Sequence, residues 1–577
     1  RDVLGSRGLG DVYKRQYTTK EKVLISALVS FVFSFIIFLF NPIDIVANNA
    51  QEFSFALSDI IGGVLLSFFA SFAILFAVLM IFNKYILNII TSLLLSVFIS
   101  DYIYNLTVGK GTLVSGDVRI DYGKSTTIFL IIIIAVAYAL FLTGVLLKNK
   151  WKNVCAFICV LLIAMNSATL VSDFATKDFV NKNGTTIKYA LSEKNLFGVS
   201  KKENVVYFLF DRFDTKYYDE VVNDNPNYFS KSLDGFTYFD NAVSTFSRTY
   251  PAVAGLITGV TYDGNTSSNE YFKKAYTTSP FLKDLKSNGY DINIYADRYY
   301  EYSDAECFKD TVSNATKING YTPDKTNILK YLLSLSDART IACKMPTLLF
   351  KHTANGTVLT LSKLNSKDKI YHDDDAALYK NLKSSGLHYT NSDKNYTFIY
   401  LHGTHSPYTL DADAQRVKSS TSKEQTIGSF KIIADYVDQM KKLGVYDNST
   451  IVITGDHGYP YTDTEPLLES TDTGTKTAVF VKPKSSKTSG LSVSHAPASV
   501  ADIIPTIVKD TGIKTSTDYG ESLFDIAQDS TRERIYYHSR LTGNSKLILD
   551  KYTITGDAAN IKNWKLEESR DTNQAWY

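Results

Sequence analysis

Net charge is almost absent from this chain. Its 577 residues include 61 Lys and Arg residues against 59 Asp and Glu residues, which leaves a formal charge of +2. A protein so close to neutral has no bulk electrostatic attraction for the phosphate backbone of DNA or RNA. The composition therefore predicts no nucleic-acid partner.

Cysteine is scarce, with four residues in the whole chain. Cys155 and Cys159 have a C-x-x-x-C spacing, which places both on one helix face but differs from the C-x-x-C spacing of redox and zinc motifs. Because they lie in an apolar run, we expect them to act as small apolar residues. Cys307 and Cys343 lie in the more polar part of the chain, and the sequence leaves open whether they pair in a disulfide.

Charged residues are missing from long stretches of the first third of the chain. A helix needs about 20 apolar residues to cross a bilayer, and charge-free runs of 20 to 24 residues occur four times before residue 173. A run of 16 residues begins at Tyr85 and spans if Asp101 lies at the interface. The sequence therefore predicts an α-helical membrane domain over residues 17–172 with about five spans, at residues 23–43, 60–83, 85–103, 125–147 and 153–172.

Buried core helices and a cleaved signal peptide are the alternatives to membrane spans. Four runs of near-full spanning length within 172 residues disfavour core helices. A signal peptide fits no better, because further spanning segments follow the first run.

The basic residues between the runs predict the orientation, because cytoplasmic loops carry the excess of Lys and Arg. With five spans, eight basic residues lie on one side of the membrane and three on the other. The N-terminal side is then cytoplasmic, and everything after Ser172 is extracytoplasmic. With four spans the basic cluster at residues 148–152 would lie outside, so the count favours five. The eight are Lys14, Arg15, Lys20, Lys22, Lys84, Lys148, Lys150 and Lys152, and the three are Lys110, Arg119 and Lys124.

Three further segments complete the predicted organisation. Residues 1–16 are polar and aperiodic, and we expect a non-native leader such as read-through of a library adapter. Residues 173–203 are polar and form a linker. Residues 204–577 are enough for one large extracytoplasmic domain with its own core.

Short apolar runs in this last segment alternate with helical patterns. The runs at residues 205–210, 292–296, 397–401, 451–454 and 478–481 are rich in Val, Ile, Tyr and Phe, which is typical of buried strands. The clearest helix begins at Thr421, with Glu424 completing a capping box, and ends at Gly444. Strands that alternate with helices predict an α/β domain with a mostly parallel sheet.

Carboxylates and imidazoles follow three of these strands directly. Asp211 follows the first, His402 and His405 follow the third, and Asp456 and His457 follow the fourth. Each alone has an ordinary alternative, such as a helix cap or a surface histidine. Because ligands bind at the carboxyl ends of strands in such a sheet, the set together predicts a divalent-metal site with oxygen and nitrogen ligands.

Thr249 is a candidate nucleophile near that metal. It stands just before Pro251 and the small, apolar run at residues 252–257, consistent with a hydroxyl at the start of a helix, where N–H groups can hold an anion. A plain helix N-cap is the alternative. Spacing alone leaves both open.

The order of these motifs resembles the alkaline phosphatase superfamily, specifically its sulfatase-like branch. The motifs are FLFDRFD, RTYPAVAGLITG, LHGTHSPY, ITGDHG and SHAPASVADIIPTI, over roughly 300 residues. With membrane helices ahead of an outer domain, the layout resembles that of lipoteichoic acid synthases and of phosphoglycerol and phosphoethanolamine transferases. The resemblance implies a sulfatase-like, alkaline phosphatase-like fold for residues 204–577.

The resemblance also implies roles for individual residues. Asp211, Thr249, Asp456 and His457 would hold one divalent ion, Mn, Zn or Mg, with a second ion left open, and Thr249 would also be the nucleophile. Where sulfatases open their motif with a cysteine, this chain has Thr249, which favours attack on phosphorus over sulfate hydrolysis. A sulfatase Asp-Asp pair is here Asp211-Arg212, so one ligand is missing. Residues that would touch the substrate are His402, His405, His495, Arg212 and Arg248.

The function expected from this resemblance is a membrane-anchored, metal-dependent transferase in the cell envelope. It would move a phosphoglycerol or phosphoethanolamine headgroup from a phospholipid to an envelope glycan or polyol through a phosphothreonine intermediate. A phosphodiesterase or phosphatase of the same superfamily, with water as acceptor, is the first alternative. A catalytically inactive membrane scaffold is the second, disfavoured because the four candidate metal ligands are all present.

Overall fold

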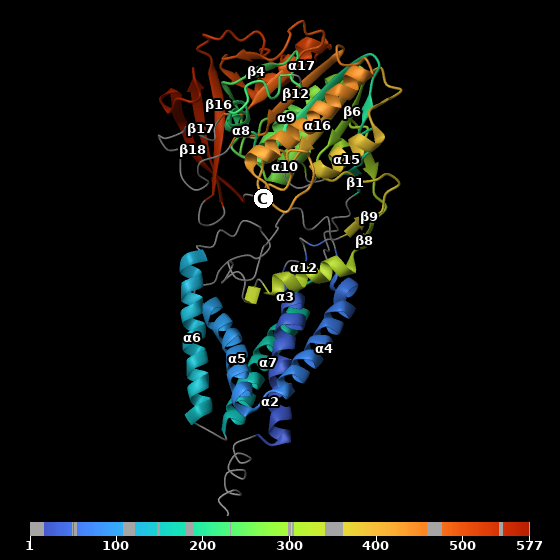
Figure 1. Ribbon diagram of the computed structural model, residues 1–577. Coiled ribbons are helices and arrows are strands. Elements are labelled where there is room, and N and C mark those ends of the chain that lie inside the picture. Colours follow the sequence, from blue (N-terminus) through green and yellow to red (C-terminus); the bar gives the residue numbers. More distant parts are fainter. Residues whose placement is uncertain are drawn as a thin grey trace, which may run out of the picture. The chain divides into compact units, whose positions relative to one another are not determined.

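The computed structural model describes residues 17–48, 50, 53, 55–107, 122–146, 150–179, 188–230, 232–297, 302, 305–337, 339–340, 362–458, 476–541 and 546–575. The chain divides into two compact units (Figure 1). The first comprises residues 1–186 with 321–365, and the second comprises residues 187–320 with 366–577. The expected leader at residues 1–16 and the question of Cys343 lie outside the described residues.

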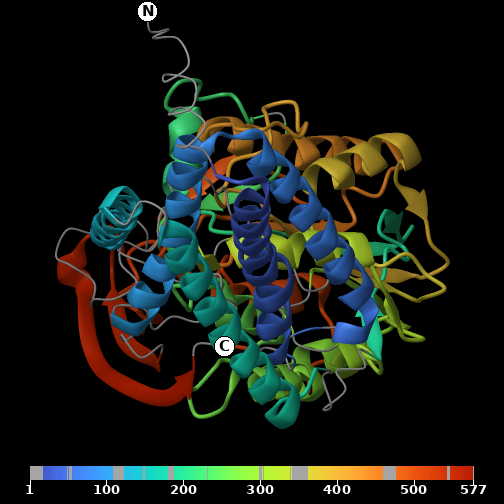
Figure 2. The same ribbon diagram turned by 90° about the horizontal axis from the view of Figure 1, so that it is seen from below.

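The first unit is helical. Its helices are α2 (Thr19–Ser34), the π-helix η1 (Phe35–Phe40), α3 (Asn41–Asn48), α4 (Leu57–Ile81), α5 (Lys84–Thr107), α6 (Tyr122–Leu146), α7 (Trp151–Thr176) and α12 (Lys325–Asp337), with one two-stranded sheet of β8 (Tyr321–Pro323) and β9 (Ser362–Leu364). In the view of Figure 2, the dark-blue α2 lies between α4 and α7, and it packs against both.

The first predicted apolar run lies on α2, η1 and α3, and the other four lie largely on α4, α5, α6 and α7. Among the described residues, four stretches are long and apolar enough to cross a membrane: Thr19–Asn48, Leu57–Ile81, Lys84–Tyr102 and Trp151–Thr176. Within α6 the stretch Leu130–Thr143 is apolar but shorter. The number of crossings and the orientation stay predictions.

Helix α12 belongs to this helical unit although its sequence lies within the predicted outer domain. Its buried face, Ile328, Leu332 and Leu335, joins an apolar cluster with residues of α3 and α4. Ser336 Oγ donates to the Ile37 carbonyl oxygen of η1 at 2.6 Å. A short amphipathic helix carries no sequence signal for which unit it joins, and the predicted boundary at residue 204 stays a prediction.

The second unit is built on one seven-stranded sheet of order β14-β4-β13-β12-β3-β11-β6. Only β13 runs antiparallel to its neighbours within this sheet. The mostly parallel sheet predicted from the sequence is therefore confirmed, and all five predicted strands are present. The seven strands are β3 (Glu203–Phe210), β4 (Thr237–Phe239), β6 (Tyr290–Tyr295), β11 (Lys394–Leu401), β12 (Ser449–Gly455), β13 (Val479–Lys482) and β14 (Ser492–Ser494).

Smaller sheets and helices surround it. The strands are β1 (Tyr189–Leu191), β2 (Gly198–Val199), β5 (Ala242–Val243), β7 (Ala315–Lys317), β10 (His388–Tyr389), β15 (Ala498–Ser499), β16 (Glu533–Leu541), β17 (Lys546–Thr555) and β18 (Trp564–Ala575). The helices are α8 (Thr215–Val222), α9 (Thr249–Thr258), α10 (Ser268–Thr278), α11 (Pro280–Ser287), α15 (Asp375–Ser385), α16 (Ser422–Lys442) and α17 (Ile503–Thr511), with 3-10 turns at Ala305–Phe308, Val500–Asp502 and Ile561–Asn563.

Helices cover both faces of the sheet because successive side chains of a strand point to opposite faces. On β3, Val205, Tyr207 and Leu209 join the apolar cluster formed with α9, α11 and α17. Val206, Phe208 and Phe210 join the other cluster, with α8, α15 and α16. Figure 1 shows α16 and α15 over that second face. Helix α16 begins at the predicted capping box of Thr421 and Glu424.

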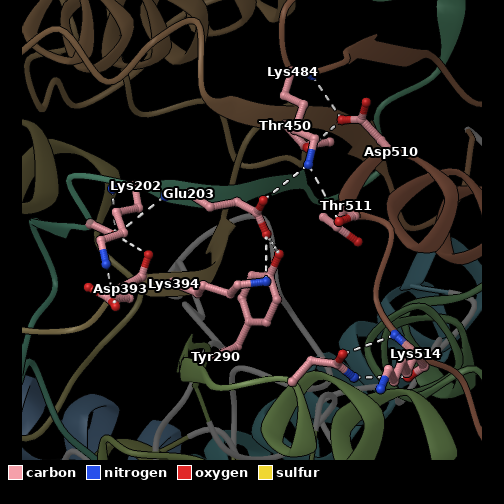
Figure 3. A network of polar contacts seen from close by, with 12 residues as sticks. Lys202, Glu203, Tyr290, Asp393, Lys394, Thr450, Lys484, Asp510, Thr511 and Lys514 are labelled. Carbon is pink, nitrogen blue, oxygen red and sulfur yellow. Dashed lines mark hydrogen bonds and ion pairs between the residues drawn. The ribbon is translucent and has the colours of Figure 1, made fainter.

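A polar network closes the sheet edge where β3, β6 and β11 begin (Figure 3). Glu203 accepts from Tyr290 Oη and lies 3.1 Å from Lys484 Nζ and 3.4 Å from Lys394 Nζ. These partners outweigh the effect of burial, so the pKa of Glu203 lies below its ordinary value. The network ties three strands together at the edge opposite the candidate site.

Candidate active site

The candidate site lies at the carboxyl edge of the sheet, where β3, β11 and β12 end side by side. These strands pair in parallel with Phe210 opposite both Leu401 and Gly455. The next residues along each strand are therefore brought together, as the sequence predicted. One group of possible metal ligands is Asp211, Asp456 and His457, and a second is Asp211, His402 and His405, with the ligand atoms of each group within 4.8 Å of one another.

Backbone N–H groups fix the first group of carboxylates. Asp456 Oδ1 accepts from the N–H of Arg212 and from that of His457, both at 2.8 Å. Arg212 reaches this position with a φ of 61°, in the left-handed region that non-glycine residues rarely adopt. The other oxygen, Asp456 Oδ2, is thereby left to face Asp211 and His457.

The remaining atoms of this group suit a cation. Among the described residues, the buried Asp211 Oδ1 and Asp456 Oδ2 have no hydrogen-bond partner. His457 Nδ1 contacts the Gly458 carbonyl oxygen at 2.5 Å, which leaves Nε2 3.6 Å from Asp456 Oδ2 and 3.9 Å from Asp211 Oδ1. Unsatisfied buried carboxylate oxygens are costly. The donor set therefore fits a divalent metal ion.

Burial and charge repulsion at Asp211 support the same reading. Burial, together with the neighbouring carboxylate of Asp456, raises the pKa of Asp211 to about 6. Two adjacent carboxylates in a buried place favour the binding of a positive charge between them. A metal ion bound there would stabilise the ionised form of Asp211.

Thr249 lies beside this group. Its Oγ1 is 3.4 Å from His457 Nε2, and it is the first residue of α9. The element is kinked just after Thr249, because Tyr250 departs from helical geometry with ψ of 124°. Regular helix therefore begins at Pro251, and the Thr249 hydroxyl lies beside the candidate ligand His457. The choice between a capping and a nucleophilic role for Thr249 stays a prediction.

The segment before Thr249 is braced by the C-terminal sheet of β16, β17 and β18. Ser247 N–H donates to the Tyr537 carbonyl oxygen at 3.0 Å, and Tyr537 N–H donates to the Thr245 carbonyl oxygen at 2.8 Å. Ser539 N–H donates to Ser247 Oγ at 2.9 Å. No sequence motif indicated this contact, because the two segments are about 290 residues apart.

His402 and His405 lie on the turn after β11. The His405 N–H donates to the His402 carbonyl oxygen at 3.1 Å, and the two rings are 5.5 Å apart. His405 Nδ1 contacts the Ser406 carbonyl oxygen. Burial, with the nearby Arg212 cation, lowers the pKa of His405, so its ring is neutral at pH 7 and can accept a proton or bind a cation.

His495 has a different environment. It follows β14, its side chain is 68% exposed, and its Nδ1 lies 2.8 Å from Asp240 Oδ2. The two ligand groups found within the described part of the chain do not include it. Its substrate-binding role stays a prediction, as do those of Arg212 and Arg248.

Two comparisons with known sequences identify proteins that this chain is similar to. A family model described as Sulfatase matches residues 203–513, which is more than half of the chain. Lipoteichoic acid synthase of Staphylococcus aureus (strain USA300) is 24% identical over 381 residues, which cover 61% of this chain and 52% of the relative. The chain spans about half the length of the curated relatives it matches, and the same values are found for the enzyme of strain NCTC 8325.

Solved structures with detectable similarity include several enzymes. The lipoteichoic acid synthase LtaP from Listeria monocytogenes has a TM-score of 0.35 at 14% identity, with 64% of this chain and 88% of that chain covered. The phosphonate monoester hydrolase SpPMH from Silicibacter pomeroyi has a TM-score of 0.34 at 13% identity, with 62% and 88% covered.

Proposed function

The chain belongs to the sulfatase family, and from this premise we propose that it is a membrane-anchored, metal-dependent transferase that moves a phospho-headgroup from a lipid to an alcohol acceptor. The observation that carries the proposal is the convergence of Thr249 Oγ1 with Asp211, Asp456 and His457. In this proposal these four residues would hold one divalent ion, which when bound would lower the pKa of the Thr249 hydroxyl and neutralise phosphoryl oxygens.

The transfer has two balanced steps. Thr249 Oγ1 attacks the phosphorus of a phospholipid headgroup, the bond from phosphorus to the diacylglycerol oxygen breaks, and the threonine proton leaves with that oxygen as diacylglycerol. An acceptor hydroxyl then attacks the phosphothreonine, its proton passes to Thr249, and the free threonine returns. His402, His405, Arg212 and Arg248 are assigned to the substrate phosphate and the leaving group.

Threonine at the nucleophile position favours phosphorus over sulfur. A sulfatase activates a modified cysteine, whereas a threonine hydroxyl beside a metal is suited to an ester intermediate that a second alcohol resolves. The likeness to lipoteichoic acid synthase, which covers half of that enzyme, supports a phospho-headgroup donor and a glycan or polyol acceptor. The choice between phosphoglycerol and phosphoethanolamine follows from the motif resemblance alone and is part of the proposal. The apolar helices support a membrane location, and the basic residues between them support an extracytoplasmic catalytic unit.

Mass spectrometry of Thr249 tests the proposal. The full chain in detergent micelles is incubated with Mn²⁺ and either phosphatidylglycerol or phosphatidylethanolamine, then quenched in acid and digested. We expect the peptide with Thr249 to gain the mass of one phospho-headgroup, and diacylglycerol to appear in equal amount. Unmodified Thr249 with no diacylglycerol from either lipid would refute the transferase. Release of free headgroup phosphate in the presence of glycerol, with none transferred to it, would instead favour the hydrolase.

A further inference from the structure

Asp375 is a buried carboxylate that lies directly beneath the turn after β11. It is the first residue of α15, and the residue is 7% exposed. Its Oδ1 accepts from the N–H of His402 and its Oδ2 accepts from the N–H of Gly403, both at 3.0 Å. These two N–H groups lie beyond the last sheet pairing of β11 at Leu401, so Asp375 supplies the acceptors that a neighbouring strand would otherwise supply.

The turn is held against β3 from its other side. Gly403 has a φ of +59°, and a Cβ at this position would lie 2.6 Å from Phe210 Cβ. Thr404 Oγ1 donates to the Asp211 carbonyl oxygen at 3.1 Å. The backbone of the turn thus packs closely against Phe210 and the candidate metal ligand Asp211, and Asp375 accepts hydrogen bonds from the same turn.

The electrostatic setting agrees with this role. Burial raises the pKa of Asp375, while the imidazole of His402 and the two N–H donors act in the opposite direction. The two N–H groups that Asp375 accepts from therefore offset part of the cost of burying this side chain.

We propose that Asp375 is a positioning residue for phosphoryl transfer, because it holds the His402–His405 turn at the distance from Asp211 that substrate binding requires. The inference rests on the proposed function insofar as His402 and His405 contact the substrate phosphate. Asp375 touches neither substrate nor metal and acts through the turn.

The neighbouring Asp374 provides a matched control. Asp374 caps the same helix by accepting from the Ala377 N–H at 2.9 Å, and it pairs with Arg416 at 2.7 Å. No contact of Asp374 with the turn is found among its described partners. Substitution of Asp374 therefore removes a carboxylate from the same helix end without removing an acceptor from His402 or Gly403.

The test compares D375N with D374N in the full chain in detergent, with bis(p-nitrophenyl) phosphate as substrate. An amide offers one acceptor oxygen and one NH2 group, so D375N leaves one turn N–H facing a donor. We expect D375N to lower kcat/KM at least about tenfold, mainly through KM, with metal content and the unfolding midpoint close to those of D374N. D374N should stay within about twofold of the parent.

Two outcomes overturn the proposal: parental kcat/KM in D375N, or an equal loss in both variants, which would indicate a helix-end effect. If D375N fails to fold, D375E replaces it. The glutamate keeps both acceptor oxygens but moves them along the side chain, and we expect a folded protein with a raised KM. Parental KM in D375E would then overturn the proposal.

A combined variant separates positioning from a general structural effect. If Asp375 acts through the two histidines of the turn, D375N adds little to the loss already caused by the double variant H402Q/H405Q, whereas independent effects multiply. Multiplied losses would contradict the proposal. The small diester makes this test independent of the lipid experiment. If the protein cleaves bis(p-nitrophenyl) phosphate but transfers no lipid headgroup, the transferase proposal is refuted, and the role of Asp375 can still be measured with the diester. If the parent acts on neither the diester nor the lipid, its affinity for inorganic phosphate is measured by calorimetry in place of KM. We then expect D375N to bind phosphate more weakly than the parent and D374N to bind it about as tightly.

Discussion

Thr249 Oγ1 and His457 Nε2 lie 3.4 Å apart, although they come from the start of α9 and the end of β12 and are separated by 208 residues. This contact places a hydroxyl next to the candidate metal ligands, just before the kink at Tyr250.

A nucleophilic role predicts a severe loss on removal of that hydroxyl. T249A should retain its fold and unfolding midpoint and lose turnover by about three orders of magnitude or more, because the covalent route disappears. T249S keeps a hydroxyl and should retain measurable activity. The readout is diacylglycerol release from phospholipid. Near-parental turnover in T249A would contradict the mechanism.

Metal binding is predicted to depend on Asp456 and His457. D456A and H457A each remove one of about four ligands, so both should lose bound metal and activity. Metal content after desalting is measured by mass spectrometry of the elements. H388A is the control, because His388 lies exposed on β10. Full metal occupancy in D456A and H457A would refute the assignment.

Acidic conditions should weaken the same site. The pKa of Asp211, raised to about 6 in the metal-free protein, lies above the ordinary aspartate value, so the carboxylate takes up a proton as the pH falls through that range. A proton competes with the metal, and the apparent metal affinity should fall from pH 7 to pH 5. Titration with Mn²⁺ at both pH values measures this. Equal affinity at the two values would argue against Asp211 as a ligand.

The side of the membrane is tested with protease. The basic residues between the apolar runs predict an extracytoplasmic second unit. Protease added to intact spheroplasts should therefore release a fragment that contains Asp456 and His457. A fragment protected until lysis would indicate an even number of crossings.

Gly403 is predicted to tolerate no side chain. G403A combines left-handed backbone strain with an overlap against Phe210, and we expect a loss of about 3 kcal/mol. G444A is the control, because Gly444 has a similar φ of +70° and nothing within 4 Å, so it should cost about 1 kcal/mol. The two variants are compared by their midpoints of thermal unfolding. Equal midpoints would show that the chain shifts to remove the overlap between the new Cβ and Phe210.

Much of the second unit could be predicted because its signals are local. Buried strands such as β3 and β12 are short, apolar and rich in β-branched or aromatic residues, and Thr421 with Glu424 marks the start of α16. The rule that parallel strands bring their carboxyl ends together then predicted the proximity of Asp211, Asp456 and His457. The roles of these residues in metal binding and catalysis stay predictions.

Features that depend on contacts between distant segments could not be predicted. Asp375 precedes His402 by 27 residues and has the sequence appearance of an acidic helix start, which says nothing about the turn that it holds. The packing of α12 on α3 and α4 could not be predicted either. An amphipathic stripe indicates that one face of a helix is buried, but it does not identify the elements that cover this face.

The brace from β16 to the residues before Thr249 has a consequence for shortened versions of this protein. The family match ends at residue 513, and β16 begins at Glu533. A fragment trimmed to the matched region would keep the seven-stranded sheet and Asp456 but would leave Thr245 and Ser247 without the backbone partners supplied by Tyr537 and Ser539. A fragment for crystallisation or inhibitor screening should therefore extend through β18, so that the whole three-stranded sheet is kept. A protease cut between residues 513 and 533, followed by loss of the C-terminal piece, should abolish activity and leave the seven-stranded sheet in place.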